Sequence, residues 1–199
     1  GAWLVRNSWG KNEYDERGYF WMSYADLTLD SNAWALDATI EGKEDFYDNN
    51  YQYDGTFEIG DSSNSDTAAN VFTASAAECG ESLEAVMFSA KEGMNKPYKV
   101  EVYKGLIDRT IPDSGILAAM ETGICPYGGI YTVELSEPVL LEEDELFSVV
   151  VTVDGGIDME DMSIENGSFT VLETTVSSSV GQSFWGYDGV WEDVGERGN

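Results

Sequence analysis

The feature that most constrains the fold is an alternation of apolar and polar residues, interrupted at short intervals by turn residues. From Leu146 to Val153, every second residue beginning at Phe147 is Phe or Val, which places these side chains on one face of an extended chain. Tyr98 to Tyr103 alternates in the same way. Glycine is frequent (21 residues against 4 prolines), and turn residues recur about every ten residues, as in all-β sandwiches. The pattern predicts an antiparallel β-sandwich, of jelly-roll type.

Other segments extend this prediction. Asp188-Gly189 is suited to a two-residue hairpin turn between two strands. Ser114 to Glu121 is the one candidate helix, although its apolar residues lack a helical period. Further strands are expected at residues 71–74, 83–90, 130–135, 168–172, 182–187 and 190–194.

The charge excludes several classes of partner. There are 38 acidic and 10 basic residues, a formal net charge of −28. Such a surface repels nucleic acid, whose affinity for proteins comes largely from Lys and Arg, and anionic membranes for the same reason. No stretch reaches the roughly 18–20 apolar residues of a membrane span, so no membrane insertion is expected. The charge either keeps the protein soluble or supplies carboxylates to Ca²⁺.

Histidine and cysteine limit the catalytic chemistry. The chain contains no His, so no imidazole can act as a general base for a nucleophile. Its two cysteines are Cys79 and Cys125, and their spacing leaves open whether they form a disulfide.

The N-terminal segment carries the most specific motif. Asn7-Ser8-Trp9-Gly10 ends one expected strand, and Gly18-Tyr19-Phe20 begins the next. Over about residues 2–25 the chain resembles the C-terminal end of a papain-family cysteine peptidase. The loop at 11–17 departs from the family pattern, with Tyr14 near the position of a usual Trp and one additional residue.

This resemblance implies roles for two residues. Asn7 would be the third triad member, which orients the catalytic His, and Trp9 would support the Asn–His pair. The catalytic Cys and His of that family are absent here, so the chain by itself is expected not to be an enzyme. The parent protein is expected to be a cysteine-type endopeptidase, with the rest of the peptidase domain as the partner of this hairpin.

The remainder resembles a second family. The order of its strand-like segments, from Tyr51-Gln52-Tyr53 through Tyr98 to Tyr103 and on to Gln182-Ser183-Phe184, resembles the lectin-like domain of clostridial surface-layer cysteine proteases. The resemblance implies a β-sandwich with a role in carbohydrate binding, calcium, and a secreted or cell-surface location in a bacterium. The expected organisation is a hairpin at 1–25, a connector at 26–44 and a lectin-like sandwich at 45–199.

Two aromatic groups are candidate ligand-binding residues. Tyr51, Tyr53 and Asp54 combine aromatic faces with polar groups, the combination that sugars require. The alternative is that both rings close one end of the sandwich and Asp54 caps a turn. Trp185 and Tyr187 share a face of another expected strand, and they either form a binding platform or pack in the core.

Calcium ligands are expected among the loop acids. The candidates are Asp48, Asp54, Asp61 and Asp66, which lie in a polar region between strands. Asp154, Asp158, Glu160 and Asp161 form a second cluster that is better explained as a solvated loop.

Together these observations predict an accessory sandwich that binds carbohydrate or a cell surface and positions a peptidase. A structural or protein-docking sandwich without sugar binding is the alternative.

Overall fold

The computed structural model describes residues 1–6, 18–26, 47–53, 59–60, 65–75, 80–160 and 179–196. The chain divides into two compact units, Gly1–Asp48 and Asn49–Asn199. The predicted connector at 26–44 lies almost entirely outside the described residues, as does the strand expected at 168–172.

The first unit contains one antiparallel hairpin. Strand β1 (Ala2–Arg6) pairs with β2 (Tyr19–Ser23) in a register that places Leu4 opposite Trp21 on one face and Val5 opposite Phe20 on the other. Both faces are apolar and exposed, and Trp21 is 71% accessible. Among the described residues, both faces of the hairpin therefore carry exposed apolar side chains.

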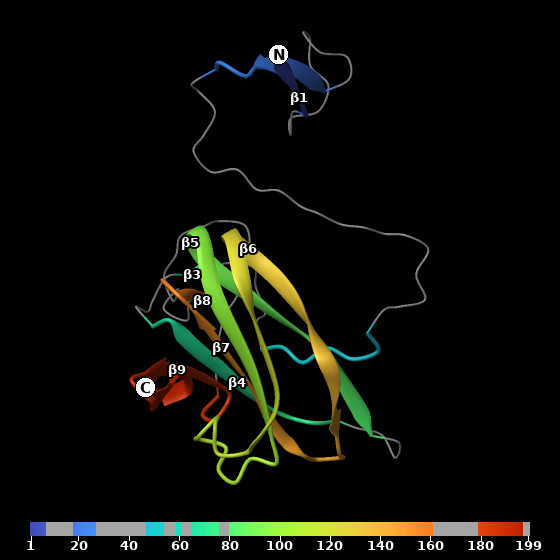
Figure 1. Cartoon of the computed structure of the whole chain (residues 1–199), viewed down its shortest axis with the longest axis vertical. Helices are drawn as coiled ribbons and strands as arrows, with labels where there is room; N and C mark the ends of the chain where they lie inside the picture. The colour runs from blue at the N-terminus through green and yellow to red at the C-terminus, as the bar shows by residue number, and fades with distance from the viewer. Residues whose placement is uncertain are drawn as a thin grey trace. The chain divides into compact units, whose positions relative to one another are not determined.

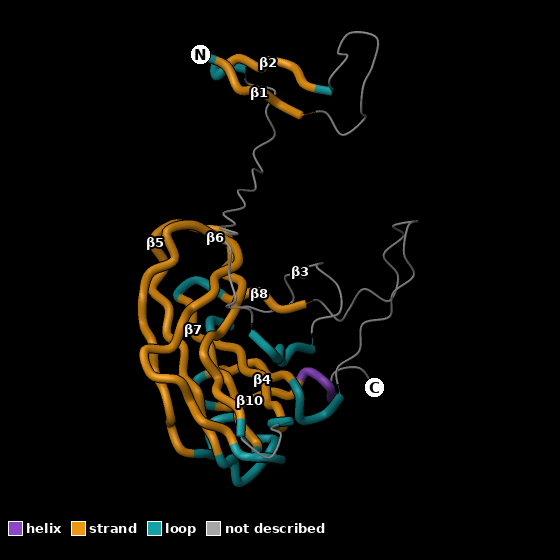
Figure 2. The backbone as a smooth tube through the Cα atoms, turned by 90° about the vertical axis from the view of Figure 1, so that its right-hand side faces the viewer, coloured by secondary structure: helices purple, strands orange, loops and turns teal. Residues whose placement is uncertain are grey.

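Among its described residues, the second unit is nearly all β, with a short 3₁₀ helix after the last strand (Figures 1 and 2). The sheet order is β10-β9-β4-β7-β5-β8-β3, and β6 pairs with β5. All pairings are antiparallel, which confirms the predicted fold class. The strands are β3 (Ile59–Gly60), β4 (Thr67–Thr73), β5 (Glu81–Lys104), β6 (Ile116–Leu141), β7 (Leu146–Val153), β8 (Ile157–Glu160), β9 (Ser183–Tyr187) and β10 (Val190–Asp193), followed by the 3₁₀ helix Val194–Glu196.

Two long strands form both layers of the sandwich. Residues 98–104 of β5 pair with β7, whereas Ser89 and Ala90 pair with β8, and β6 accompanies β5 through both halves. A register shift at Ala90/Met94 separates the halves, and Figure 1 shows the two strands running together through the molecule. The rings of Phe88 and Tyr98, one from each half, lie 5.3 Å apart. The halves therefore face each other across one core.

The central strands are covered on both faces. Phe147, Val151 and Trp185 belong to the main core between the layers, whereas Val150 and Phe184 belong to a second cluster on the outer face. Leu106, in the loop between β5 and β6, covers this second cluster. The loop is held in place by hydrogen bonds from Ser148 Oγ to the Pro112 carbonyl and from Trp191 Nε1 to Asp113.

One secondary-structure prediction is wrong. The candidate helix at Ser114–Glu121 is the start of β6, which begins at Ile116. Pairing of Ile116 to Glu121 with β5 gives these residues backbone partners and overrides their helical propensity. By contrast, the Asp188-Gly189 turn is confirmed, because both residues have positive φ angles (49° and 81°) and directly join β9 to β10.

Among the described residues, no helix has the length and apolar character needed to cross a membrane.

Candidate functional site

Tyr51 and Tyr53 are packed against the main core of the sandwich. The Tyr51 ring centre lies 5.1 Å from that of Phe147, and the Tyr53 ring stacks on Phe72 at 4.8 Å. The Tyr53 hydroxyl donates a hydrogen bond to the Val71 carbonyl at 2.6 Å. Burial raises the Tyr53 pKa above its ordinary value, and the nearby Arg109 opposes that rise. Packing and hydrogen bonding therefore account for both rings.

The Tyr51 hydroxyl belongs to a polar network. It donates a hydrogen bond to Glu81 and accepts one from the Ser75 backbone N–H at 2.7 Å. The Asn49 side chain donates to Glu81 at 2.8 Å and to Ser75 Oγ at 2.9 Å. The Tyr51 hydrogen bond holds the pKa of Glu81 below its usual value, and the bonds from Asn49 and Ser75 act in the same direction. This network fastens the start of the second unit to β5.

Trp185 and Tyr187 have different surroundings. Trp185 is 3% exposed within the main core, whereas Tyr187, at the end of β9, is 36% exposed. Phe184 fills the outer cluster on the opposite face of β9. Neither face of the strand is open beside Trp185, so these two residues do not form an exposed platform.

The predicted metal ligands are only partly described. Asp48 and Asp66 are both exposed, while Asp54 and Asp61 lie outside the described residues. The two residues predicted from the peptidase motif, Asn7 and Trp9, also lie outside the described residues. Within the described ranges, no group of three or more His, Cys, Asp or Glu side chains is positioned to hold a metal ion. Since two of the four candidate ligands lie outside the described residues, the calcium site stays a prediction.

Cys125 is free and buried on β6. Burial raises the pKa of its thiol, with Lys96 opposing the rise. Of the two pairing states that the sequence left open, the free thiol is the one that this cysteine adopts.

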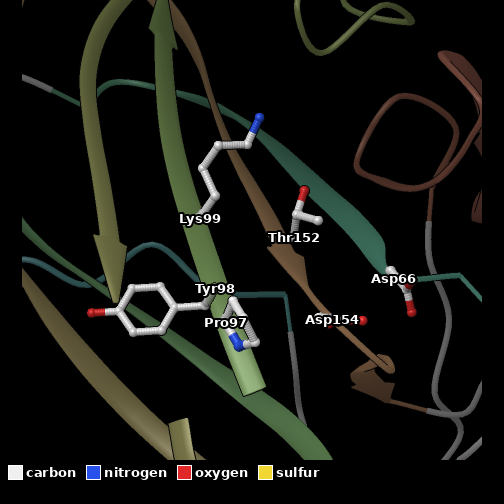
Figure 3. Close-up of a pocket in the computed structure, with 6 residues that line it drawn as sticks. All are labelled: Asp66, Pro97, Tyr98, Lys99, Thr152 and Asp154. Carbon is white, nitrogen blue, oxygen red and sulfur yellow. The ribbon is translucent and has the colours of Figure 1, made fainter. Parts of the chain in front are cut away.

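A shallow depression of about 340 Å³ lies at the side of β5 and β7 (Figure 3). Lys99 and Thr152 project into it from directly opposed positions on the two strands. Asp66 directly precedes β4 and Asp154 directly follows β7, and both also line the depression. Pro97 and Tyr98 complete the lining. Its volume is within the range of small-ligand pockets.

Hydrogen bonds fix the shape of the depression. The Val153 N–H donates to the Asp66 carbonyl at 2.8 Å, and the Asp154 N–H donates to the Pro97 carbonyl at 2.9 Å. Thr152 Oγ1 lies 3.0 Å from Thr67 Oγ1 on the next strand. The depression is thus open and lined mainly by apolar surface, with two carboxylates, a hydroxyl and the Lys99 ammonium, which forms a salt bridge with Glu101 at 2.8 Å. Such a set can bind a small polyhydroxylated ligand through both donors and acceptors.

Sequence reasoning missed this arrangement. Alternation along β5 indicates that Lys99 faces outward, but nothing in the sequence pairs it with Thr152, which is 53 positions away (152 − 99). Asp66 was predicted only as a metal ligand, and Asp154 only as part of a solvated loop.

Comparisons with known proteins identify the same fold. A family model described as "Lectin like domain" matches residues 50–199. No match was found among curated proteins. The crystal structure of the cysteine protease and lectin-like domains of Cwp84, a surface layer associated protein of Clostridium difficile, is 24% identical with a TM-score of 0.67. It aligns over 97% of this chain and 41% of its own length.

A second structure, of the clostridial cysteine protease Cwp84 after propeptide cleavage, is 23% identical with a TM-score of 0.67. It aligns over 98% of this chain and 47% of its own length. The chain therefore spans less than half the length of each of these two solved structures.

Proposed function

The chain belongs to the family of lectin-like domains, and we propose that its sandwich is an accessory module of a bacterial papain-like cysteine peptidase. In this proposal the protein is secreted or held at the cell surface. The sandwich binds carbohydrate there and positions the peptidase near its substrate.

The hairpin supports the peptidase part of the proposal. Its two apolar faces need cover on both sides, because a two-stranded ribbon is marginally stable alone. The rest of a peptidase domain, as found in the matched structures, would supply that cover. In the parent enzyme a Cys thiolate would attack the peptide carbonyl, and Asn7 would orient the His that accepts the thiol proton.

The single observation that supports carbohydrate binding is the depression beside β5 and β7. Lys99, Thr152 and the two carboxylates of Asp66 and Asp154 offer hydrogen-bond donors and acceptors to sugar hydroxyls. Pro97 adds apolar surface for sugar C–H groups. This location replaces Tyr51, Tyr53 and Trp185 as the proposed contact surface, since those three side chains pack in the sandwich.

Binding of the 199-residue chain to a glycan array and to purified bacterial cell walls tests the proposal. Each measurement is made with calcium and with chelator, so that a metal requirement is detected independently of the site. Lys99→Ala and Asp154→Asn are expected to abolish binding, while Glu137→Gln, which removes one exposed charge elsewhere, leaves it unchanged. A folded protein that binds no glycan or cell wall in either condition contradicts the carbohydrate role.

A structural or protein-docking role is the second candidate. It is favoured by the packing of Tyr51, Tyr53 and Trp185, which removes the most prominent aromatic residues from the list of ligand contacts. In that case the array shows no binding, and the sandwich serves to brace the peptidase or to hold a protein partner.

A further inference from the structure

Directly opposed residues form a row across the outer face of one layer of the sandwich. Lys99 is opposite Thr152, which is opposite Thr67. Thr67 is also opposite Gly186, and Gly186 is opposite Trp191. Opposed residues of antiparallel strands point to the same side of a sheet, so these five residues, called the outer row below, share one face from β10 to β5. Their neighbours in β4, β5, β7 and β9 pack in the main core, which places the row on the outside: Ala68, Val100, Val151, Val153 and Trp185.

The outer row is accessible to solvent, unlike the row beside it. Thr67, Thr152, Gly186 and Trp191 are partly exposed, and the Lys99 side chain is 44% exposed. The adjacent row of the same face belongs to the outer cluster, which the loop between β5 and β6 covers. The outer row is therefore the first line of side chains that this loop leaves open.

Trp191 places an aromatic ring at one end of the row. Its Nε1 donates a hydrogen bond to Asp113 at 2.9 Å, which fixes the orientation of the indole. A Cβ at Gly186 would lie 3.0 Å from the Trp191 ring and 3.1 Å from the Thr67 methyl group. Glycine therefore lets the ring lie over β9, beside Thr67. An aromatic ring held in this way can stack on the C–H face of a sugar with little loss of side-chain entropy.

The rest of the row carries hydrogen-bonding groups. Thr67 Oγ1 and Thr152 Oγ1 lie 3.0 Å apart. Their mutual hydrogen bond uses one of two hydroxyl protons, so the other proton and several lone pairs can serve a ligand. The Lys99 ammonium is bound to Glu101 at 2.8 Å and has further protons to donate. Figure 3 shows Lys99 and Thr152 projecting to the same side of their strands.

The outer row is longer than a single sugar. It crosses the neighbouring strands β10, β9, β4, β7 and β5. Adjacent strands lie about 4.8 Å apart, so Trp191 and Lys99 are separated by about 19 Å. One pyranose unit of an extended glycan is about as long as one such spacing. The depression at Lys99 can therefore hold only one end of a chain that follows the whole row.

An uncharged glycan chain is the occupant that these groups fit. The net charge of −28 disfavours polyanions. An extended peptide binds to a sheet through unpaired backbone groups at an edge, whereas the row crosses strands whose backbones are paired with one another. Hydroxyls, an ammonium group and an aromatic ring match the hydroxyl and C–H groups of sugars.

We propose that the outer row binds an extended, uncharged glycan chain laid across β10, β9, β4, β7 and β5. Trp191 stacks on a sugar at one end, Thr67 and Thr152 bind hydroxyls in the middle, and Lys99 binds the sugar in the depression. This inference rests on the proposed carbohydrate function and adds the class of ligand, a polysaccharide bound along its length.

Calorimetric titration of the 199-residue chain with glycans of increasing length tests the proposal. The probe is the uncharged fraction of purified bacterial cell-wall polysaccharide, cleaved by partial acid hydrolysis and separated by size. Affinity should rise by about tenfold or more between single sugars and chains of about five units, and should then stay constant, because longer chains extend beyond the row.

Removal of the aromatic ring should affect long chains selectively. Trp191→Ala should weaken the binding of a chain that spans the row by about tenfold. It should leave the affinity for fragments of two sugars unchanged, since these are held at the depression. Trp21→Ala is the matched control, because Trp21 is an exposed tryptophan of the hairpin, and it should leave both affinities unchanged.

A milder variant separates loss of binding from loss of folding, because Trp191 also packs against the outer cluster. Thr67→Val keeps the shape of the side chain and removes a hydroxyl from the middle of the row. It should weaken the binding of long chains by about threefold to tenfold, with an unchanged circular-dichroism spectrum. Thr132→Val, at an exposed threonine of β6 outside the row, should have no effect.

Two results would overturn this inference and leave the carbohydrate function intact. The first is equal affinity for single sugars and for long chains. The second is an affinity that rises with length but is unchanged in both Trp191→Ala and Thr67→Val. Absence of binding to every fragment and to intact cell walls would instead contradict the proposed function, and this inference with it.

Discussion

In the hairpin, Trp3, Leu4 and Trp21 are each more than half exposed, whereas in the sandwich Val100 and Phe147 are sealed from solvent. Both regions are made of apolar, antiparallel strands. They differ in whether the chain supplies a second layer. The sandwich folds its own sheet over through β5 and β6, while among the described residues of the first unit no second layer packs on the hairpin. A two-stranded ribbon by itself is at best marginally stable in water.

The largest expected difference between the two regions comes from truncating an aromatic side chain in each. Phe147→Ala should lower the free energy of unfolding of the sandwich by about 3–5 kcal/mol, because it leaves a cavity in the main core. Trp21→Ala should change it by less than about 0.5 kcal/mol, as for an exposed site. Urea unfolding followed by circular dichroism measures both. Equal losses would show that the hairpin shares the core of the sandwich.

The next effect concerns the Asp188-Gly189 turn. Gly189→Ala should cost about 1–2 kcal/mol, because φ is +81° and the left-handed region is unfavourable for a residue with a Cβ. A Cβ at this position meets no other atom, so the cost is purely conformational. Glycine at position 188 can adopt the same backbone conformation, so Asp188→Gly is expected to lower the free energy of unfolding by only a few tenths of a kcal/mol. If both variants unfold at the same urea concentration, the turn does not hold β9 against β10.

A smaller effect is expected where the second unit begins. Tyr53→Phe keeps the ring stacked on Phe72 and removes its hydrogen bond to the Val71 carbonyl, so stability should fall by about 1 kcal/mol. The same variant should bind glycans as well as the wild type, since the proposed contacts lie at Lys99 and Asp154. Selective loss of glycan binding with unchanged stability would return Tyr53 to the site.

The smallest expected effect is on how the stability of the sandwich depends on pH in the acidic range. The folded-state pKa of Glu81 lies below its unfolded value, so its ionised form stabilises the sandwich above the unfolded pKa of about 4.3. That contribution is lost as the pH falls through the lower, folded-state pKa. In the Glu81→Gln protein, the melting temperature should therefore fall less steeply with decreasing pH in this range. Near pH 7 the dependence of melting temperature on pH should match that of the wild type. A variant that declines as steeply as the wild type would contradict this role.

The sequence allowed the fold class to be predicted because burial imposes alternation. Leu146 to Val153 has the same bounds in the sequence pattern and in the structure, and the Asp188-Gly189 turn follows from the backbone preferences of its residues. The continuity of β5 could not be predicted, since Lys91 to Lys96 interrupts the apolar pattern at the register shift.

The site was harder to predict than the fold. Aromatic residues such as Tyr53 and Trp185 suit a sugar platform and a sandwich core equally well, and only their contacts show that they pack. The depression depends on Lys99 and Thr152 being opposed across two strands, which is a property of register. A single sequence contains no direct information on that pairing.

Hydrogen exchange of the whole chain, followed by mass spectrometry, tests the comparison between hairpin and sandwich most directly. The amides of β4, β5 and β7 should exchange slowly, because they belong to a sheet with a core of its own, while those of β1 and β2 should exchange almost as fast as unfolded peptide. Equally slow exchange in β1 and β2 would contradict the account, since it would show that the hairpin is stable without the remainder of a peptidase domain.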